Sequence, residues 1–382
     1  MGVLAPACSG SVTKAIPRNA LALESYAADS RIRNYVLQTP LLASQWLTSY
    51  MHPSSSSEGA AAQAAAYPLP PVSVWMKMES EQISGSFKAR GAFNKLLSLT
   101  PEQQAAGLYA ASSGNHALAM VDACLLLASQ HQEGSGTTAA STAGPMPMPV
   151  LYLSTAADGH KIKKLKEKKA VVVIHGDDAV QAEVACREKA EAVGGTYVSP
   201  YNDFQVAGGQ GTIAVEMLRQ RQGMAPLDVV FIPVGGGGLI AGIASVLKAT
   251  DPPPYIIACQ PAASDVMRVS VLAGKVLDLP SDDTLSDGTA GGVEAGTMTF
   301  EPCCSLVDQW VTISEQEIAD AMIGVLHHHG KIIEGAAGVV VAAFQQLAPT
   351  LVGKQVALVI CGGNVSTATL RQALSMSNVD SA

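Results

Sequence analysis

Four short stretches of this sequence combine residue types that could do chemistry, and the sharpest is a run of four glycines. Gly235 to Gly238 lie between an apolar segment, Val229–Val234, and a helix-forming segment, Leu239–Leu247. Consecutive glycines let backbone N–H groups converge, and a helix that starts there adds its positive end. The loop is therefore suited to a phosphate monoester, with a flexible strand–helix turn as the alternative. It matches neither GxGxxG nor GxxxxGK[ST], which disfavours dinucleotides and nucleoside triphosphates.

The other three stretches supply an amine, a polar turn and a thiol. SGSFKARGA (84–92) places Lys88 among small residues that leave room for a planar group. The alternative interpretation is that Lys88 is an ordinary exposed lysine. SSGNH (112–116) could bind a carboxylate through its N–H groups and hydroxyls, or simply cap a helix. CGGN (361–364) follows an apolar strand, where a buried thiol is usually inert packing.

The segments around these stretches alternate between short apolar runs and helical periods. This alternation predicts the α/β class, with parallel strands and helices on both faces of the sheet. We expect helices at Gly85–Leu97, His116 to about Ser129 and Leu239–Leu247. The expected strands are Val72–Met78, Leu108–Ala111, Val150–Leu153, Val171–His175, Val229–Val234, Tyr255–Cys259 and Val356–Cys361.

Composition narrows the functional classes. The chain has 382 residues, 48% of them hydrophobic and 15% charged, with a net charge of −8, which is typical of a folded protein and argues against nucleic-acid or anionic-lipid partners. It has no uninterrupted apolar run of about 18 residues, so we expect no membrane span. The seven cysteines form no CxxC pair, which indicates neither a disulfide framework nor zinc. We expect a cytoplasmic protein. The absence of acidic residues from the first 23 positions keeps plastid or mitochondrial import as an alternative.

Four biased segments receive no functional role. Pro53–Pro71 and Gln132–Pro149 are low-complexity runs that we interpret as surface insertions. Lys161–Lys169 carries six lysines in nine residues, and we interpret it as a solvated helix face rather than a phosphate or RNA patch. His327–His329 is interpreted as a helix end, because adjacent histidines on a helix point in different directions. No metal site is expected.

Taken together, the motifs resemble one family. SGSFKARGA, ASSGNHA, PVGGGGL and CGGN occur in that order, and GQGTIAVE (209–216) and EGAAGV (334–339) add to the likeness. The chain resembles the fold type II pyridoxal-phosphate enzymes, which are tryptophan synthase β-like, and within them the serine/threonine dehydratase and serine racemase branch. The resemblance runs from about Arg31 to Gln372 outside the two insertions.

The resemblance implies a fold and an assembly. Two open, twisted α/β domains would hold the cofactor in the cleft between them. The large domain would comprise residues 1–107 and 205–382, and the small domain residues 108–204. Family members are usually homodimers.

The resemblance also implies roles for individual residues. Lys88 would bind pyridoxal 5'-phosphate covalently and, once released, act as the base at the substrate Cα, while Phe87 would pack against the pyridine ring. Asn115 would bond the ring oxygen, and Cys361, with Glu334 nearby, would face the ring nitrogen. A neutral thiol there would favour loss of a β-substituent over transamination. The phosphate would be held by Gly235, Gly236, Gly237, Gly238 and Leu239, and the substrate carboxylate by Ser112, Ser113, Gly114, Asn115 and His116.

The implied reaction is β-elimination of a small β-hydroxy amino acid, L-threonine or L-serine, to a 2-oxo acid and ammonia. Ser113 makes serine racemase activity an alternative, because the second acid/base of racemases stands at this position. Hydroxyaspartate dehydratases also carry a serine here, so that activity is a further alternative. Gln260 and Val266 stand where racemases carry acidic cation ligands, and Ser286–Glu294 resembles bacterial-type dehydratases, so the dehydratase is favoured. A pyridoxal-phosphate-binding protein without catalysis is the non-enzyme alternative.

Overall fold

The computed structural model of the chain describes residues 3–4, 19–51, 73–133, 146–155, 159–177 and 179–379. The insertion predicted at 53–71 lies outside these ranges, as do residues 134–145 of the second insertion and most of the first 23 residues. Within the described ranges, no helix is long and apolar enough to cross a membrane.

The larger of two sheets contains seven described strands in the order β1-β10-β9-β8-β11-β3-β2. Its five inner strands run parallel, and the short strands β1 and β2 pair antiparallel at the two edges. The α/β class with parallel strands is therefore confirmed, whereas β1, β2 and β10 were not predicted. The strands are β1 (Val3–Leu4), β2 (Leu41–Ala43), β3 (Val74–Met78), β8 (Val229–Pro233), β9 (Tyr255–Pro261), β10 (Gln309–Ile313) and β11 (Val356–Ile360).

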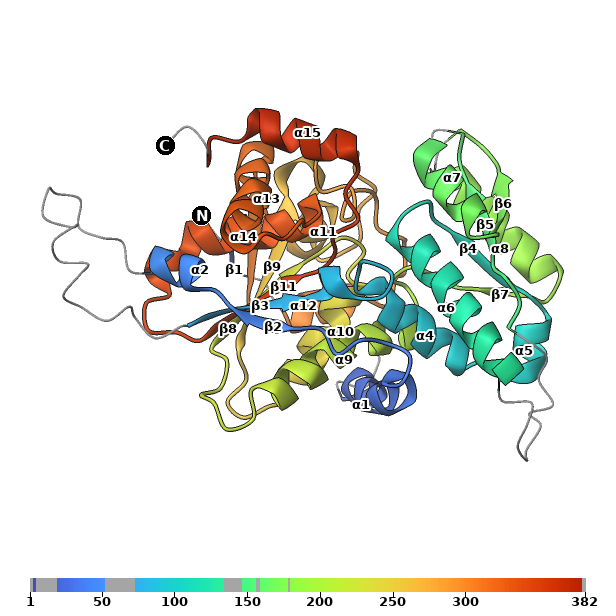
Figure 1. Ribbon diagram of the computed structural model, residues 1–382, viewed down its shortest axis with the longest axis horizontal. Coiled ribbons are helices and arrows are strands. Elements are labelled where there is room, and N and C mark those ends of the chain that lie inside the picture. Colours follow the sequence, from blue (N-terminus) through green and yellow to red (C-terminus); the bar gives the residue numbers. More distant parts are fainter. Residues whose placement is uncertain are drawn as a thin grey trace, which may run out of the picture.

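The smaller sheet contains four described parallel strands in the order β6-β5-β4-β7. They are β4 (Leu108–Ala111), β5 (Val150–Leu153), β6 (Val171–Ile174) and β7 (Thr196–Tyr197). All four lie within 108–204, the residues assigned above to a small domain. Figure 1 shows this sheet with its helices on the right of the view, beside the larger sheet.

Helices cover both faces of the larger sheet. Figure 1 shows α13, α14 and α15 above it and α1, α9 and α10 below it. Helix α4 packs on both α9 and α6, so it lies between the two sheets. Three 3-10 turns are also described, η1 (Glu79–Glu81), η3 (Ala262–Ser264) and η4 (Ala348–Thr350). The helices are α1 (Ala20–Ile32), α2 (Gln45–Tyr50), α4 (Lys88–Leu97), α5 (Pro101–Ala105), α6 (Asn115–Glu133), α7 (Gly159–Glu167), α8 (Ala179–Ala192), α9 (Phe204–Gln220), α10 (Gly238–Leu247), α11 (Val266–Ala273), α12 (Phe300–Ser305), α13 (Glu315–His329), α14 (Gly335–Leu347) and α15 (Thr367–Met376).

Helix α4 begins at Lys88, three residues later than predicted. Gly85 has φ +74°, which turns the chain sharply and which residues other than glycine rarely adopt. Ser86 then forms an isolated antiparallel bridge with Gly362, and the Phe87 N–H donates to the Cys361 carbonyl at 3.0 Å. The prediction that Gly85 opens the helix was wrong, because this pairing with the end of β11 occupies the residues before Lys88.

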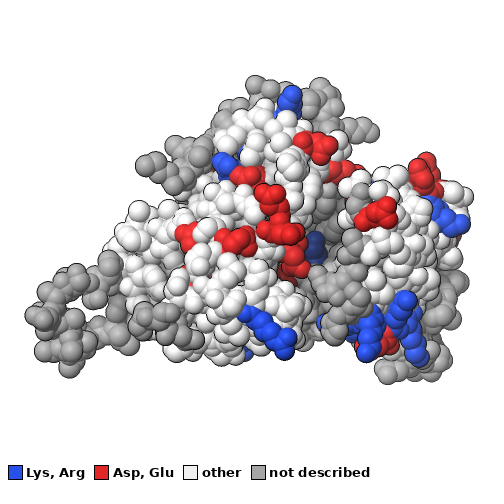
Figure 2. All heavy atoms as spheres, turned by 90° about the horizontal axis from the view of Figure 1, so that it is seen from above, with Lys and Arg blue, Asp and Glu red and all other residues white. Residues whose placement is uncertain are grey.

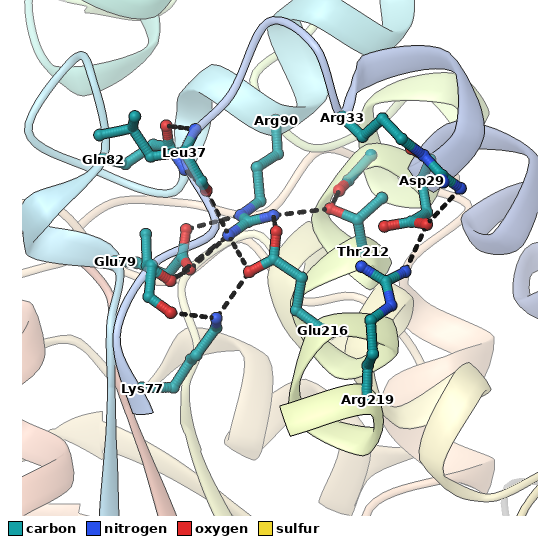
Figure 3. Close-up of polar contacts among 12 residues, drawn as sticks. Asp29, Arg33, Leu37, Lys77, Glu79, Gln82, Arg90, Thr212, Glu216 and Arg219 are labelled. Carbon is teal, nitrogen blue, oxygen red and sulfur yellow. Dashed lines mark hydrogen bonds and ion pairs between the residues drawn. The ribbon is translucent and has the colours of Figure 1, made fainter. Parts of the chain in front are cut away.

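A buried group of four charged residues holds α4 from its other side. We call Lys77, Glu79, Arg90 and Glu216 the ionic cluster. Arg90 donates to Glu79 at 2.7 and 2.8 Å and to Glu216 at 2.8 and 2.9 Å, and Lys77 donates to Glu216 at 2.6 Å (Figure 3). All four side chains are at most 6% exposed. The cluster joins β3, η1 and α9 to the first turn of α4 and therefore fixes where that helix starts.

Two interpretations of biased segments are confirmed. Helix α7 occupies most of the lysine-rich run, with Leu165 buried and the Lys163 side chain 72% exposed. The three histidines end α13, where His328 stacks on Trp46 with ring centroids 4.5 Å apart. Both segments are thus accounted for by packing and solvation.

Candidate active site

Lys88 is the residue at which the predicted motifs converge. It is the first residue of α4, and its Nζ donates to the Pro200 carbonyl at 2.7 Å and lies 5.0 Å from the centroid of the Phe87 ring. The side chain keeps some solvent exposure, but protein atoms crowd its amine. This desolvation lowers the pKa of Lys88 to about 8, although the nearby Cys361 and Glu334 work in the opposite direction. A substantial fraction of the amine is therefore neutral at mildly alkaline pH.

A second group of polar side chains lies at the carboxyl end of β11. The Asn115 amide nitrogen donates to both Glu334 carboxylate oxygens, at 3.1 and 2.9 Å, and the Cys361 thiol donates to the same carboxylate at 3.6 Å. Asn364 in turn donates to the Asn115 side-chain oxygen at 2.8 Å. Motifs from three distant parts of the sequence thus meet here. We call Lys88, Asn115, Glu334 and Cys361 the lysine site.

Burial moves the acid groups of the lysine site toward their neutral forms. Glu334 is 3% exposed, and desolvation raises its pKa to about 7 despite its hydrogen bonds from Asn115 and Cys361. Cys361 is 2% exposed, and burial together with the neighbouring Glu334 raises the pKa of its thiol well above the usual value. Cys361 is therefore a neutral thiol at physiological pH.

The four glycines connect β8 to α10 as predicted, and neighbouring residues enclose them closely. Gly237 has φ +85°, and a Cβ there would lie 3.0 Å from the Cys303 sulfur. A Cβ on Gly236 would lie 2.4 Å from the Tyr201 ring, and one on Gly235 would lie 3.0 Å from Thr289. Only glycine can occupy these positions without displacing a neighbour. Because α10 starts at Gly238, its first N–H groups have no partners within the helix and are directed at the loop.

The polar turn at 112–116 leads into α6, but one of its side chains is committed elsewhere. His116 is 2% exposed, and one ring nitrogen contacts the Val198 carbonyl at 2.9 Å. Desolvation, with the positive charge of Lys88, lowers the pKa of His116 to about 3, so the ring is neutral. Its other ring nitrogen, Nδ1, is buried without a protein partner. The imidazole therefore offers a carboxylate no positive charge, and the backbone N–H groups of this turn remain the donors to consider. The Ser112 hydroxyl accepts the Gly114 N–H at 3.2 Å, which closes the turn.

The structure adds residues to the site that the sequence did not single out. Pro200 supplies the carbonyl that accepts the Lys88 amine, and Tyr201 packs against the glycine loop. The Thr299 hydroxyl donates to the Gly236 carbonyl at 2.6 Å. No local pattern marks Pro200, Tyr201 or Thr299, because each acts through a contact with a residue far away in the sequence.

These features match the requirements of pyridoxal phosphate. A glycine-only loop at a helix start suits its phosphate, and a desolvated amine with a lowered pKa is what an imine-forming lysine needs. The family model described as pyridoxal-phosphate dependent enzyme matches residues 60–362. The chain belongs to this family, and its cofactor is pyridoxal phosphate.

Relatives and solved structures agree with this assignment. An L-threonine ammonia-lyase of Thermotoga maritima is 35% identical over 295 residues, which are 76% of this chain and 67% of that protein. The processed form of threonine deaminase isoform 2 from Solanum lycopersicum superposes with a TM-score of 0.79 at 25% identity, covering 98% of this chain and 97% of that one. Maize serine racemase superposes with a TM-score of 0.75, also at 25% identity, covering 93% of this chain and 96% of that one.

Proposed function

We propose that this chain catalyses the β-elimination of L-threonine or L-serine to 2-oxobutyrate or pyruvate and ammonia. The observation that carries the proposal is the Lys88 amine, which desolvation brings to a pKa of about 8 next to a neutral thiol and a glycine loop. The similarity to an L-threonine ammonia-lyase selects threonine as the first substrate to test.

The chain's own residues would divide the work as follows. Gly235–Gly238 and the Leu239 N–H would hold the cofactor phosphate, Phe87 would face the ring, and Asn115 would bond the ring oxygen. When bound, the cofactor supplies an electron sink for the charge that develops at the substrate Cα. The N–H groups of residues 112–116 would bind the substrate carboxylate. Lys88, as a neutral amine, would accept the Cα proton.

The choice of elimination is supported by Cys361. A neutral thiol facing the ring nitrogen would leave that nitrogen unprotonated, which limits delocalisation into the ring and favours departure of a β-substituent. The β-hydroxyl would leave as water after gaining a proton, and hydrolysis of the released enamine would give the 2-oxo acid and ammonia.

A serine racemase is the second candidate, and Ser113 is the residue that favours it. Ser113 lies in the turn before α6, where a hydroxyl opposite Lys88 could return a proton to Cα. Racemases of this family bind a cation through two acidic residues, whereas here the Gln260 side chain accepts the Arg268 N–H at 2.9 Å and Val266 is buried. These residues support the lyase as the main activity. A homodimer and a cytoplasmic location remain expectations of this proposal.

The test measures several products of one enzyme. Purified protein with pyridoxal phosphate is given L-threonine or L-serine, and 2-oxo acid and D-serine are quantified together. We expect abundant 2-oxo acid, little D-serine, and a loss on the order of 10³-fold or more in Lys88→Ala. D-serine formed at a comparable rate, and lost in Ser113→Ala, would make the racemase the main activity. If neither 2-oxo acid nor D-serine forms, both the lyase and the racemase proposals are overturned. Hydroxyaspartate is then the next substrate to test, and cofactor binding without catalysis is the remaining alternative.

A further inference from the structure

A five-residue segment lies between the two chemical parts of the site. It comprises Ser199–Asp203 in the connection from β7 to α9, and we call it the strap. The Pro200 carbonyl accepts the Lys88 amine at 2.7 Å, and the Tyr201 ring lies so close to Gly236 that a Cβ there would be 2.4 Å from the ring. The strap backbone is equally close to the last glycine, since a Cβ on Gly238 would lie 2.9 Å from the Tyr201 Cα. The position of the strap therefore affects both the Lys88 amine and the glycine loop.

Glu294 holds the strap by its backbone and by its side chain. The Glu294 N–H donates to the Tyr201 hydroxyl at 3.0 Å, and the Asn202 amide donates to the Glu294 carboxylate at 2.7 Å. The Asn202 side-chain oxygen also accepts the Met298 N–H at 3.0 Å, so both the nitrogen and the oxygen of the Asn202 amide are hydrogen-bonded. Glu294 ends the Ser286–Glu294 segment that the sequence comparison singled out.

The same carboxylate links the strap to a helix of the smaller sheet. Arg187 on α8 pairs with Glu294 at 2.9 Å and with Glu183 at 2.7 Å, and its guanidinium lies 4.3 Å from the centroid of the Tyr197 ring. Arg187 and Glu294 are 36% and 29% exposed, so they lie at the rim of the site. Figure 2 shows the surface hollowed between the larger and smaller parts of the molecule, with acidic side chains gathered beside the hollow.

We propose that Glu294 is a positioning residue for the cofactor: through Asn202 and Arg187 it keeps the strap seated between Lys88 and the glycine loop. The inference rests on the cofactor site described above and extends the proposed function, because it concerns a residue that has no role in the proposed binding or proton transfer. Loss of the carboxylate would free the strap, and the glycine loop and the Lys88 amine would then lose a fixed neighbour. Cofactor affinity would fall as a result.

The test compares two carboxylates that share one arginine. Glu294→Gln and Glu183→Gln each remove one negatively charged partner of Arg187, but only Glu294 is hydrogen-bonded to the strap. Titration of apoprotein with pyridoxal phosphate, followed by the absorbance of the lysine-bound cofactor, gives Kd for each variant. We expect Kd to rise about fivefold or more in Glu294→Gln and to change by less than about twofold in Glu183→Gln, since both variants weaken a contact with Arg187 but only Glu294→Gln also weakens the charge-assisted hydrogen bond from Asn202 of the strap. Equal Kd values in the two variants, or tighter binding in Glu294→Gln, would overturn the proposal.

Two further readouts separate positioning from a general loss of structure. Hydrogen exchange of the apoprotein should increase at the strap amides of residues 199 and 201–203 in Glu294→Gln and not in Glu183→Gln, while unfolding midpoints stay alike because the Arg187–Glu294 pair is partly exposed. The exchanged pair Arg187→Glu/Glu294→Arg should recover part of the affinity lost in Glu294→Arg alone, and no recovery would count against the link to α8. None of these measurements uses a substrate. If the wild-type enzyme is inactive on every β-hydroxy amino acid, the proposed function is wrong, but this inference is unaffected.

Discussion

Lys88 and Arg90 are two residues apart on α4, and their charged groups lie in opposite electrostatic surroundings. Arg90 belongs to the ionic cluster, where two basic and two acidic side chains are buried together and their charges cancel (Figure 3). Lys88 belongs to the lysine site, where the amine has a carbonyl as its hydrogen-bond acceptor and the Glu334 carboxylate is hydrogen-bonded to Asn115. About half a turn of helix thus separates a compensated cluster from an uncompensated one.

The pKa directions express this difference. Burial works against the charges of both Arg90 and Glu216. Glu79 and Glu216 nevertheless raise the pKa of Arg90 above the usual value, and Arg90 and Lys77 hold the pKa of Glu216 below the usual value. Lys77 is the exception within the cluster, because burial lowers its pKa even though Glu79 and Glu216 oppose the shift. In the lysine site, Lys88 falls to a pKa of about 8 and Glu334 rises to about 7. The cluster maintains charge for structure, whereas the site keeps groups close to exchanging protons.

The largest effect should come from breaking the compensated cluster. Arg90→Met leaves Glu79 and Glu216 buried with only Lys77, and removing one partner of a buried pair costs about 3–5 kcal/mol of unfolding free energy. Chemical denaturation of the apoprotein measures this cost. Arg90→Lys is the matched variant, since it restores the charge without the paired geometry and should lose less. A loss below about 1 kcal/mol in Arg90→Met would mean that the cluster does not hold α4 in place.

The same substitution at two lysines should change stability in opposite directions. Lys77→Met removes a cation that donates to Glu216 at 2.6 Å, and we expect a loss of about 3 kcal/mol. Lys88→Met removes an amine that burial destabilises. A shift from 10.5 to about 8 would correspond to about 3 kcal/mol, which we reduce to a gain of about 1–2 kcal/mol for partial exposure and for the Pro200 carbonyl left without its donor.

The gain in Lys88→Met should depend on pH in a defined way. Below about pH 8 the amine is charged in both the folded and the unfolded protein, so the destabilisation is fully present. Between about pH 8 and 10.5 the folded protein binds fewer protons than the unfolded one, and wild-type stability rises with pH. The advantage of Lys88→Met in the apoprotein should therefore shrink over that interval. A constant difference from pH 7 to 10 would contradict the lowered pKa of Lys88.

The sequence predicted the site motifs better than the contacts between them. The inner strands of the larger sheet, apart from β10, and the glycine loop follow from local pattern, because apolar runs and consecutive glycines leave few alternatives. The start of α4 was misplaced because the bridge between Ser86 and Gly362 is a long-range contact. Arg90 and Glu216 both lie in quoted motifs, yet nothing local indicates that they form an ion pair. Tyr201 and Glu294 were missed as a pair for the same reason.

The smallest effect should come from an ion pair at the edge of Figure 3, and it isolates burial as the cause of the difference. Arg219 donates to Asp29 at 2.6 Å, which is as short as the 2.7 Å contact between Arg90 and Glu79, but the Arg219 side chain is 45% exposed whereas Arg90 is fully buried. Water screens the exposed pair, and Arg33 provides a second partner for Asp29 at 3.1 Å. Arg219→Ala should therefore cost less than about 1 kcal/mol by the same denaturation measurement. A cost close to that of Arg90→Met would show that distance, rather than burial and compensation, determines what an arginine–carboxylate contact contributes to this fold.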